Sequence, residues 1–216
     1  MPVINEIAML DSHTLRVACE ALAASDEALA FVFEKYGTPP LWERPRGFAT
    51  LIHIILEQQV SLASAKACFE KLNEKIGDVT PASLLKLDDI GFKVVGFSRQ
   101  KTAYARHLAA AIAEGRIDLE RLASLPDAEV KSELMKLNGV GQWTADIYLL
   151  MALLRPDIMP KGDLALHVAH QMLTNSASRP GADEFITIAE KWRPYRSVAA
   201  RLLWHFYLSE RRKSER

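Results

Sequence analysis

The sequence has little cysteine and no long apolar run. Cys19 and Cys68 are too few for a disulfide framework, a four-thiolate zinc site or a four-cysteine iron–sulfur cluster. The longest apolar runs, such as 51–56 and 147–154, fall well short of the roughly 18 residues that a membrane-spanning helix needs. We therefore expect no membrane association.

The amino-terminal residues also lack the pattern of a signal peptide. They contain Glu6 and Asp11 where a basic region followed by an apolar core would stand, so we expect a cytoplasmic, reducing location. The 216 residues are 49% hydrophobic and 25% charged, which excludes collagen-like and disordered chains. This length predicts one domain or two closely packed lobes.

The formal net charge of the chain is zero, because 27 basic residues balance 27 acidic ones. The distribution is uneven, however. Residues 1–34 contain six acidic residues and one basic residue, whereas residues 191–216 contain eight basic residues and two acidic ones. Such polarity can give one face a positive potential for nucleic acid, or it can reflect two solvated helix faces.

Apolar residues recur at helical spacing along most of the chain, and no alternating strand pattern occurs. The sequence therefore predicts an all-α fold. Glycine, proline and capping residues set the expected helix ends. The expected helices span 12–36, 48–76 with a break at 58–61, 98–114, 124–137, 142–154, 163–173, 184–192 and 195–211.

The most informative segment, 137–145, reads LNGVGQWTA. Two helices meet there at a short turn with Gly139 and Gly141 at its ends, and glycine leaves room for a ligand. The second helix begins with N–H groups and a positive dipole end, which together can bind a phosphate. A tight helix–helix turn without a ligand is the alternative interpretation.

Asp163 follows 22 residues after Gly141, within MPKGDL at 159–164. This arrangement resembles the helix-hairpin-helix DNA glycosylase superfamily and, more narrowly, the 3-methyladenine DNA glycosylase II family. Three further segments are similar to that family: LEQQVS at 56–61, GFSRQK at 96–101, and WRPYRS at 192–197 followed by Leu203 and Trp204. The resemblance runs from about 48 to 207.

The resemblance implies one helix-hairpin-helix domain over 1–216 without an N-terminal β domain. It would consist of a lobe at about 50–160, a second lobe at 1–49 plus 161–216, and a cleft between them. It also implies a monomeric base-excision repair enzyme for duplex DNA, at the nucleoid in a prokaryote or in the nucleus in a eukaryote.

Asp163 matches the family's catalytic position, where a carboxylate would stabilise the oxocarbenium-like sugar that forms as the base leaves. A plain helix N-cap is its alternative role, and both can hold together. Trp143 stands where strand-cutting members have a lysine for Schiff-base chemistry, so the resemblance implies a monofunctional enzyme.

The resemblance places Trp204 and Trp143 in the pocket for the damaged base. An alkylated purine is cationic, and an indole face attracts a cation. Core packing is the alternative for both side chains. Ile147 and Leu164 depart from the family, since some members have tyrosine at these positions.

To reach its target base, such an enzyme flips the nucleotide and fills the gap in the duplex. Gln59, with Gln58 beside it, matches the inserted residue, although a polar helix break is the alternative. Glu57 replaces a glycine common in relatives. The expected hairpin contacts to phosphate are Gly139, Val140, Gly141 and Thr144, and further expected DNA contacts are Ser61, Arg99 and Lys101.

No catalytic metal or cofactor is expected. His167 and His170 have ligand-like i, i+3 spacing but no convincing third ligand, while the resemblance allows a structural monovalent cation at the hairpin carbonyls. Excision of 3-methyladenine and 7-methylguanine is the leading hypothesis. The alternatives are a DNA-binding module that has lost excision, kept open by Glu57, Ile147 and Leu164, and a glycosylase for deaminated or oxidised bases.

Overall fold

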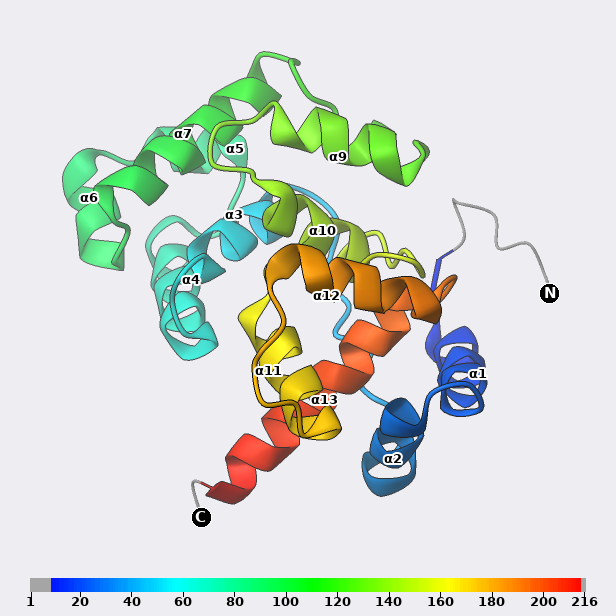
Figure 1. Ribbon diagram of the computed structural model, residues 1–216. Helices are drawn as coiled ribbons and strands as arrows, with labels where there is room; N and C mark the ends of the chain where they lie inside the picture. The colour runs from blue at the N-terminus through cyan, green and yellow to red at the C-terminus, as the bar shows by residue number, and fades with distance from the viewer. Residues whose placement is uncertain (1–8, 215–216) are drawn as a thin grey trace. The chain divides into compact units, whose positions relative to one another are not determined.

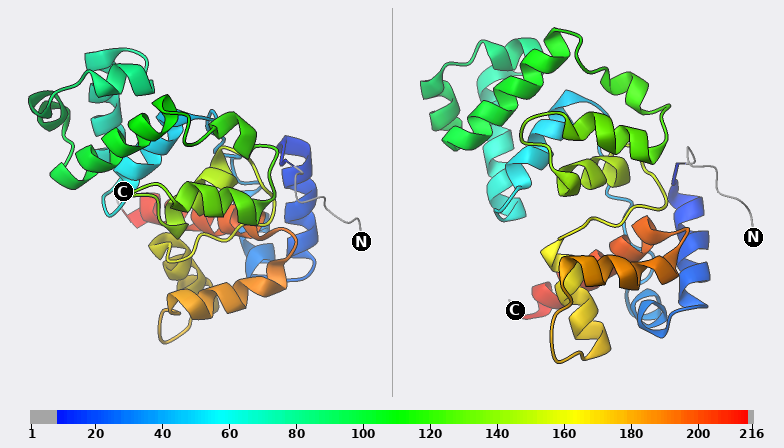
Figure 2. Two further views of the ribbon diagram at one scale, coloured as in Figure 1. Left: turned by 90° about the horizontal axis from the view of Figure 1, so that it is seen from above. Right: turned by 45° about the horizontal axis from the view of Figure 1, so that its top comes forward.

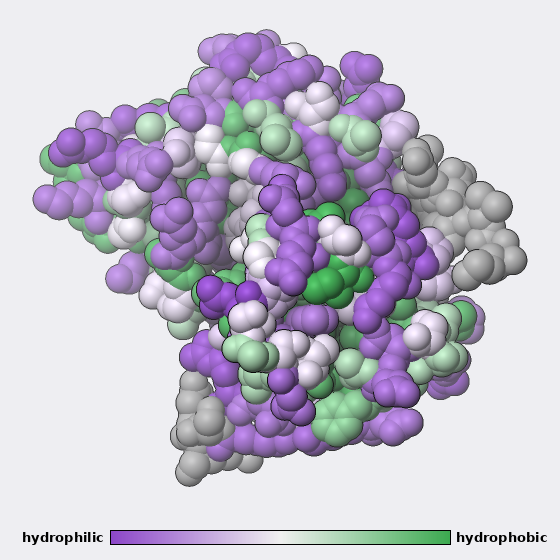
Figure 3. Space-filling view, in the orientation of Figure 1, coloured by the Kyte–Doolittle hydropathy of each residue, from purple (hydrophilic) through white to green (hydrophobic). Residues whose placement is uncertain are grey.

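The computed structural model describes residues 9–214, and over that range it is helical without strands (Figure 1). The all-α prediction is confirmed. The helices divide between two compact units, one formed by Met1–Glu43 and Leu149–Arg216 and the other by Arg44–Tyr148. Among the described residues, no helix is long and apolar enough to cross a membrane. Hydrophilic side chains cover most of the face in Figure 3.

The first unit combines the amino-terminal helices with the last helices of the chain. Its helices are α1 (Ser12–Ala23), α2 (Glu27–Tyr36), α11 (Leu164–Thr174), α12 (Ala182–Ala189), the 3₁₀ turn η1 (Glu190–Trp192) and α13 (Arg196–Ser214). The amino-terminal α1 and α2 and the later α11 all pack on α13 (Figures 1 and 2). The acidic and basic segments of the sequence therefore meet in one unit and partly neutralise each other, as in the Lys191–Asp26 pair at 2.8 Å.

The second unit contains the hairpin. Its helices are α3 (Phe48–Glu57), α4 (Leu62–Ile76), α5 (Pro81–Leu85), α6 (Asp89–Val95), α7 (Arg99–Ala113), α8 (Leu119–Leu122), α9 (Asp127–Met135) and the greater part of α10 (Gln142–Met151). Helix α3 packs against α4 and α7, and α7 also packs against α5 and α6. Leucine and isoleucine side chains of α3 are fully buried, which stabilises the unit by about 1.5–3 kcal/mol for each side chain.

Most helix starts follow the expected caps, but the helix predicted at 124–137 spans Asp127–Met135, and the one predicted at 142–154 ends at Met151. The predicted helix at 12–36 is two helices, because Asp26 accepts hydrogen bonds from the N–H groups of Ala28 and Leu29 and so starts α2. The short helices α5, α6 and α8 were not predicted from the sequence. The expected break between α3 and α4 is confirmed, and Ser61 and Ser98 cap α4 and α7 as predicted.

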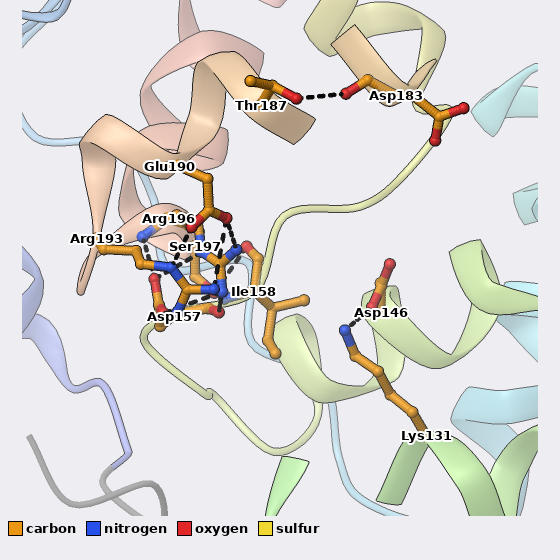
Figure 4. A network of polar contacts seen from close by, with 10 residues as sticks. All are labelled: Lys131, Asp146, Asp157, Ile158, Asp183, Thr187, Glu190, Arg193, Arg196 and Ser197. Carbon is orange, nitrogen blue, oxygen red and sulfur yellow. Dashed lines mark hydrogen bonds and ion pairs between the residues drawn. The ribbon is translucent and has the colours of Figure 1, made fainter. Parts of the chain in front are cut away.

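The boundary between the units also differs from the predicted lobe at about 50–160. Residues 149–160 belong with α13, because the N–H of Ile158 donates to the Ser197 hydroxyl at 2.9 Å and Asp157 pairs with Arg196 at 2.9 Å (Figure 4). The chain therefore changes unit within α10 rather than near residue 160.

A buried arginine organises the first unit. Arg201 lies inside α13 and donates to three backbone carbonyls, those of Leu41 (2.9 Å), Leu150 (2.8 Å) and Ser197 (3.1 Å). Burial lowers the pKa of its guanidinium to about 10. The carbonyls satisfy this buried charge, and in return Arg201 ties α13 to the backbone at Leu41 and Leu150.

Candidate functional site

Asp163 is held at the start of α11. A turn closed by the Asp163 N–H on the Pro160 carbonyl, with Gly162 at φ +80°, leads the chain into the helix. Asp163 Oδ1 accepts from the Leu166 N–H at 3.1 Å and from Trp204 Nε1 at 3.2 Å. Asp163 is therefore an N-cap, and a second hydrogen bond from α13 fixes the orientation of its half-buried carboxylate.

One indole ring, that of Trp204, contacts this carboxylate, and a second, that of Trp42, packs against the first. Trp204 is 8% exposed, and its ring meets Trp42 edge to face, with centroids 6.3 Å apart and planes at 77°. Trp42 comes from the linker between α2 and α3 and is half-buried. Sequence reasoning missed Trp42, because a lone tryptophan among prolines and charged residues carries no periodic or motif signal.

The histidines near Asp163 pack against aromatic rings. His167 lies one turn after Asp163 and 4.6 Å from the Phe185 ring, and His170 contacts Phe185 and Trp192. Burial lowers the pKa of His167, although the charge of Asp163 opposes the shift. Among the described residues, no three His, Cys, Asp or Glu side chains gather where they could hold a metal ion.

In the second unit, the two hairpin glycines differ. Gly139 has φ +87°, and a Cβ there would lie 2.2 Å from Cγ of Tyr104 on α7. Gly141 is exposed, and a Cβ there would meet nothing within 4 Å. Gly139 is therefore required by the fold, whereas Gly141 leaves open space at the N-terminus of α10, where helix N–H groups point outward.

The other predicted hairpin residues face the protein interior. The Val140 side chain is 5% exposed, and its N–H donates to the Leu137 carbonyl at 3.1 Å. The Thr144 side chain is 1% exposed, and its hydroxyl accepts from Gln58 Nε2 at 2.9 Å. The Val140 N–H is committed to that carbonyl and both side chains face inward, so a phosphate contact here would fall to other backbone N–H groups at the start of α10.

Gln58 and Gln59 separate into different environments. Gln58 Nε2 also donates to the Gly139 carbonyl at 2.8 Å, so insertion of Gln58 into DNA would break two hydrogen bonds to the hairpin. Gln59 is exposed at φ +57° at the tip of the turn, next to Val60, which is 46% exposed. Gln59 is therefore exposed at the turn, whereas Gln58 fixes the turn from the protein side.

Lys101 holds the same turn. Its ammonium donates to the carbonyls of Leu56 at 2.6 Å and Gln58 at 2.9 Å, at the C-terminus of α3. Burial lowers the pKa of this amine. Of the other predicted contacts, Arg99 is exposed and Ser61 caps α4 through the Ser64 N–H at 3.2 Å. The Gln58 and Lys101 side chains together form what we call the turn latch.

Glu57 is buried and paired. Its carboxylate accepts two hydrogen bonds from Arg44, at 2.7 and 3.0 Å, and its side chain is only 6% exposed. His53 Nε2 lies 3.8 Å away, and the His53 ring stacks on Phe69. Glu57 therefore anchors the last turn of α3 to the chain before the helix.

The remaining predicted positions lie in different surroundings. Trp143 is half-buried in the first turn of α10, and Ile147 is 2% exposed in the core of the same unit. Leu164 is 58% exposed, directly after Asp163. An ion pair that the sequence did not reveal, Lys131–Asp146 at 2.6 Å, joins α9 to α10 (Figure 4).

The fold, the hairpin and the capped aspartate define the class of protein. Residues 52–194 match the HhH-GPD superfamily of base excision DNA repair proteins, and the chain belongs to that superfamily.

Two relatives identify the named enzymes that this chain resembles. The DNA-3-methyladenine glycosylase of Bacillus subtilis (strain 168) is 27% identical over 172 residues, 74% of this chain and 57% of that protein. The structure of Schizosaccharomyces pombe 3-methyladenine DNA glycosylase (Mag1) in complex with abasic DNA superposes with a TM-score of 0.80 at 26% identity, covering 87% of this chain and 95% of that one. The chain spans 66% and 57% of the length of two Bacillus subtilis relatives.

The fold is shared with enzymes named for a different lesion. A Clostridium acetobutylicum 8-oxoguanine glycosylase/lyase in complex with double-stranded DNA has a TM-score of 0.79 at 20% identity, covering 94% of this chain and 71% of that one. Since the scores are nearly equal, the backbone alone does not distinguish the substrates, and the side chains of the site must do so.

Proposed function

We propose that this protein is a monofunctional DNA glycosylase that excises alkylated purines, 3-methyladenine and 7-methylguanine, from duplex DNA and leaves an abasic site. The observation that carries the proposal is the Asp163 carboxylate, oriented by the Leu166 N–H and the Trp204 indole. The names of the Bacillus and Schizosaccharomyces relatives support the same substrate class.

Asp163 would act on the sugar. As the glycosidic bond breaks, positive charge develops at C1′, and a fixed carboxylate lowers the barrier by stabilising that charge. An alkylated purine is already a good leaving group because it carries a positive charge. The base therefore needs no general acid, which suits a site whose carboxylate is assigned to the sugar.

Trp143 supports the monofunctional assignment. Strand cleavage by this type of enzyme requires an amine that forms a Schiff base with the sugar, and an indole has no such amine. Water would then be the only nucleophile, and the product would be an intact strand with an abasic sugar.

The second unit would bind duplex DNA, which we propose as the partner of this protein. We also propose that the enzyme is a monomer. The open space at Gly141 and the N-terminus of α10 suit a phosphate, which fixes position without reading sequence. The exposed Gln59 would fill the gap left by the everted nucleotide and hydrogen-bond the orphaned base. We propose no cofactor for this reaction.

The test is base release from a lesion panel by the wild type and by Asp163→Asn. Asparagine is as good an N-cap as aspartate, so the fold should survive while kcat falls on the order of 100-fold or more. Release of 7-methylguanine without strand scission is expected from the wild type. Equal release by the variant would remove Asp163 from the mechanism, and release of hypoxanthine or 8-oxoguanine alone would replace the proposed substrate.

A further inference from the structure

Trp42 is a large aromatic side chain that the proposed mechanism has not used. It lies in the linker between α2 and α3 with a backbone φ of +49°, a conformation that is unusual for a bulky residue. The carbonyl of its neighbour Leu41 accepts from Arg201 Nε at 2.9 Å. A fully buried guanidinium on α13 therefore fixes the backbone where Trp42 starts.

The Trp204 ring contacts both Trp42 and Asp163. Trp204 donates to Asp163 at 3.2 Å and meets Trp42 edge to face at 6.3 Å. On the other side, the His205 ring lies 6.4 Å from Trp42. Trp42 is only half-buried, so part of this residue remains accessible next to the Trp204 ring that contacts Asp163.

We propose that Trp42 is a specificity-determining residue that binds the cationic face of an alkylated purine. This inference rests on the proposed function and extends it to a residue outside the motifs. A cation is attracted to an indole face, and the attraction grows when water is excluded. Trp204 is 8% exposed and its N–H is committed to Asp163, so Trp42 offers the more accessible indole of the pair.

The charge of the base separates this role from simple packing. A packing role predicts that a Trp42 variant loses activity equally on cationic and neutral bases. A cation–π role predicts a selective loss on the cationic base, of about 2- to 30-fold for one such contact.

The experiment compares 7-methylguanine, which is cationic, with hypoxanthine, which is neutral, in the same duplex. We expect Trp42→Leu to lower kcat/KM for 7-methylguanine by about 2- to 30-fold and to leave that for hypoxanthine nearly unchanged. Trp42→Phe should give a kcat/KM for 7-methylguanine between those of the wild type and Trp42→Leu. Because it keeps an aromatic ring, it also serves as the control for misfolding. Phe31→Leu, an exposed aromatic replacement elsewhere in the same unit, is the matched control.

A second readout does not require excision of hypoxanthine. Inhibition by free 7-methylguanosine, a cation, is compared with inhibition by neutral guanosine, and Trp42→Leu should lose the preference for the cation. No base release by the wild type from any lesion would overturn the proposed function. Normal release with an unchanged charge preference in both Trp42 variants would overturn only the inference about Trp42.

Discussion

The two units of this protein position their functional groups by different means. In the unit at 44–148, the side chains of Gln58, Thr144 and Lys101 turn inward. Their hydrogen bonds hold the backbone of the turn and the hairpin in shape. In the other unit, the functional groups are themselves side chains. Asp163 and Trp42 remain half-buried while neighbouring groups fix them.

This difference matches the two tasks proposed for the units. Binding of phosphate without sequence preference needs correctly spaced N–H groups, which the backbone provides. Stabilising a sugar cation and selecting a base need a charge and a π face, which only side chains provide. A substitution in the unit at 44–148 should therefore act mainly through the backbone that it holds or opens, whereas one at Asp163 or Trp42 should act directly on the chemistry.

The two hairpin glycines give the largest expected contrast. Gly139→Ala should destabilise the protein by about 2–5 kcal/mol, because it adds a Cβ at φ +87° and 2.2 Å from the Tyr104 ring. Gly141→Ala should leave stability unchanged or raise it by up to about 1 kcal/mol. The same Cβ should weaken duplex binding about 10-fold by costing one phosphate contact of about 1.4 kcal/mol.

Urea denaturation and a fluorescence anisotropy titration with duplex DNA measure both effects. Adding Tyr104→Ala to Gly139→Ala should recover the steric part of the loss but not the part due to φ. If Gly141→Ala binds DNA as tightly as the wild type does, the hairpin is not the phosphate site.

Most of the helices could be predicted from the sequence because their ends carry local signals. Ser61, Ser98 and Asp163 cap helices where their residue types predict it. The break at Asp26 was missed because the apolar spacing continues across it. The short helices α5, α6 and α8 contain one or two turns, too few for a periodic pattern to emerge.

Residues of the candidate site could be predicted only where they lie in a sequence motif. Motif spacing singled out Asp163, whereas Trp42 depends on tertiary contacts with α13 that no local pattern encodes. The partner of Glu57 was likewise unpredictable, because Arg44 lies before α3 and meets Glu57 only after the chain folds back. Gln58 and Gln59 are adjacent and chemically identical, and only the backbone conformation separates their environments.

Substitutions in the turn latch should have effects of intermediate size on stability and on kcat. Lys101→Met leaves the carbonyls of Leu56 and Gln58 without a charged donor, which should cost about 1.5–3 kcal/mol of stability. Displacement of the Gln59 turn should also lower kcat by about 10- to 100-fold with little change in KM, since misplacement of a positioning group acts on the reaction. Single-turnover excision kinetics measure this split.

Gln58→Met, which keeps the length but removes the amide, should reproduce the effect of Lys101→Met on kcat. The matched control for charge is Lys75→Met, at an exposed position near the end of α4. An effect of Lys75→Met equal to that of Lys101→Met would mean that net charge, not the latch, governs the rate.

The smallest expected effect is a difference in acid sensitivity between the units. Burial lowers the pKa of His167 and His170 in one unit and of His53 in the other below the ordinary value for histidine, about 6.5. As the pH falls below about 6.5, the unfolded chain takes up protons before the folded one does. Each histidine then removes stability at no more than about 1.4 kcal/mol per pH unit until its folded pKa is reached.

Because two of these three histidines lie on α11, acid should loosen the unit that contains Asp163 more than the unit that contains the hairpin. Amide hydrogen exchange at pH 7 and pH 5.5 measures this locally, with α11 expected to lose more protection than α3. His167→Gln should reduce the loss, whereas His13→Gln, at an exposed position in α1, should not. Equal acid sensitivity of α11 and α3 would mean that the whole chain opens as one cooperative structure, so the division of tasks would not extend to stability.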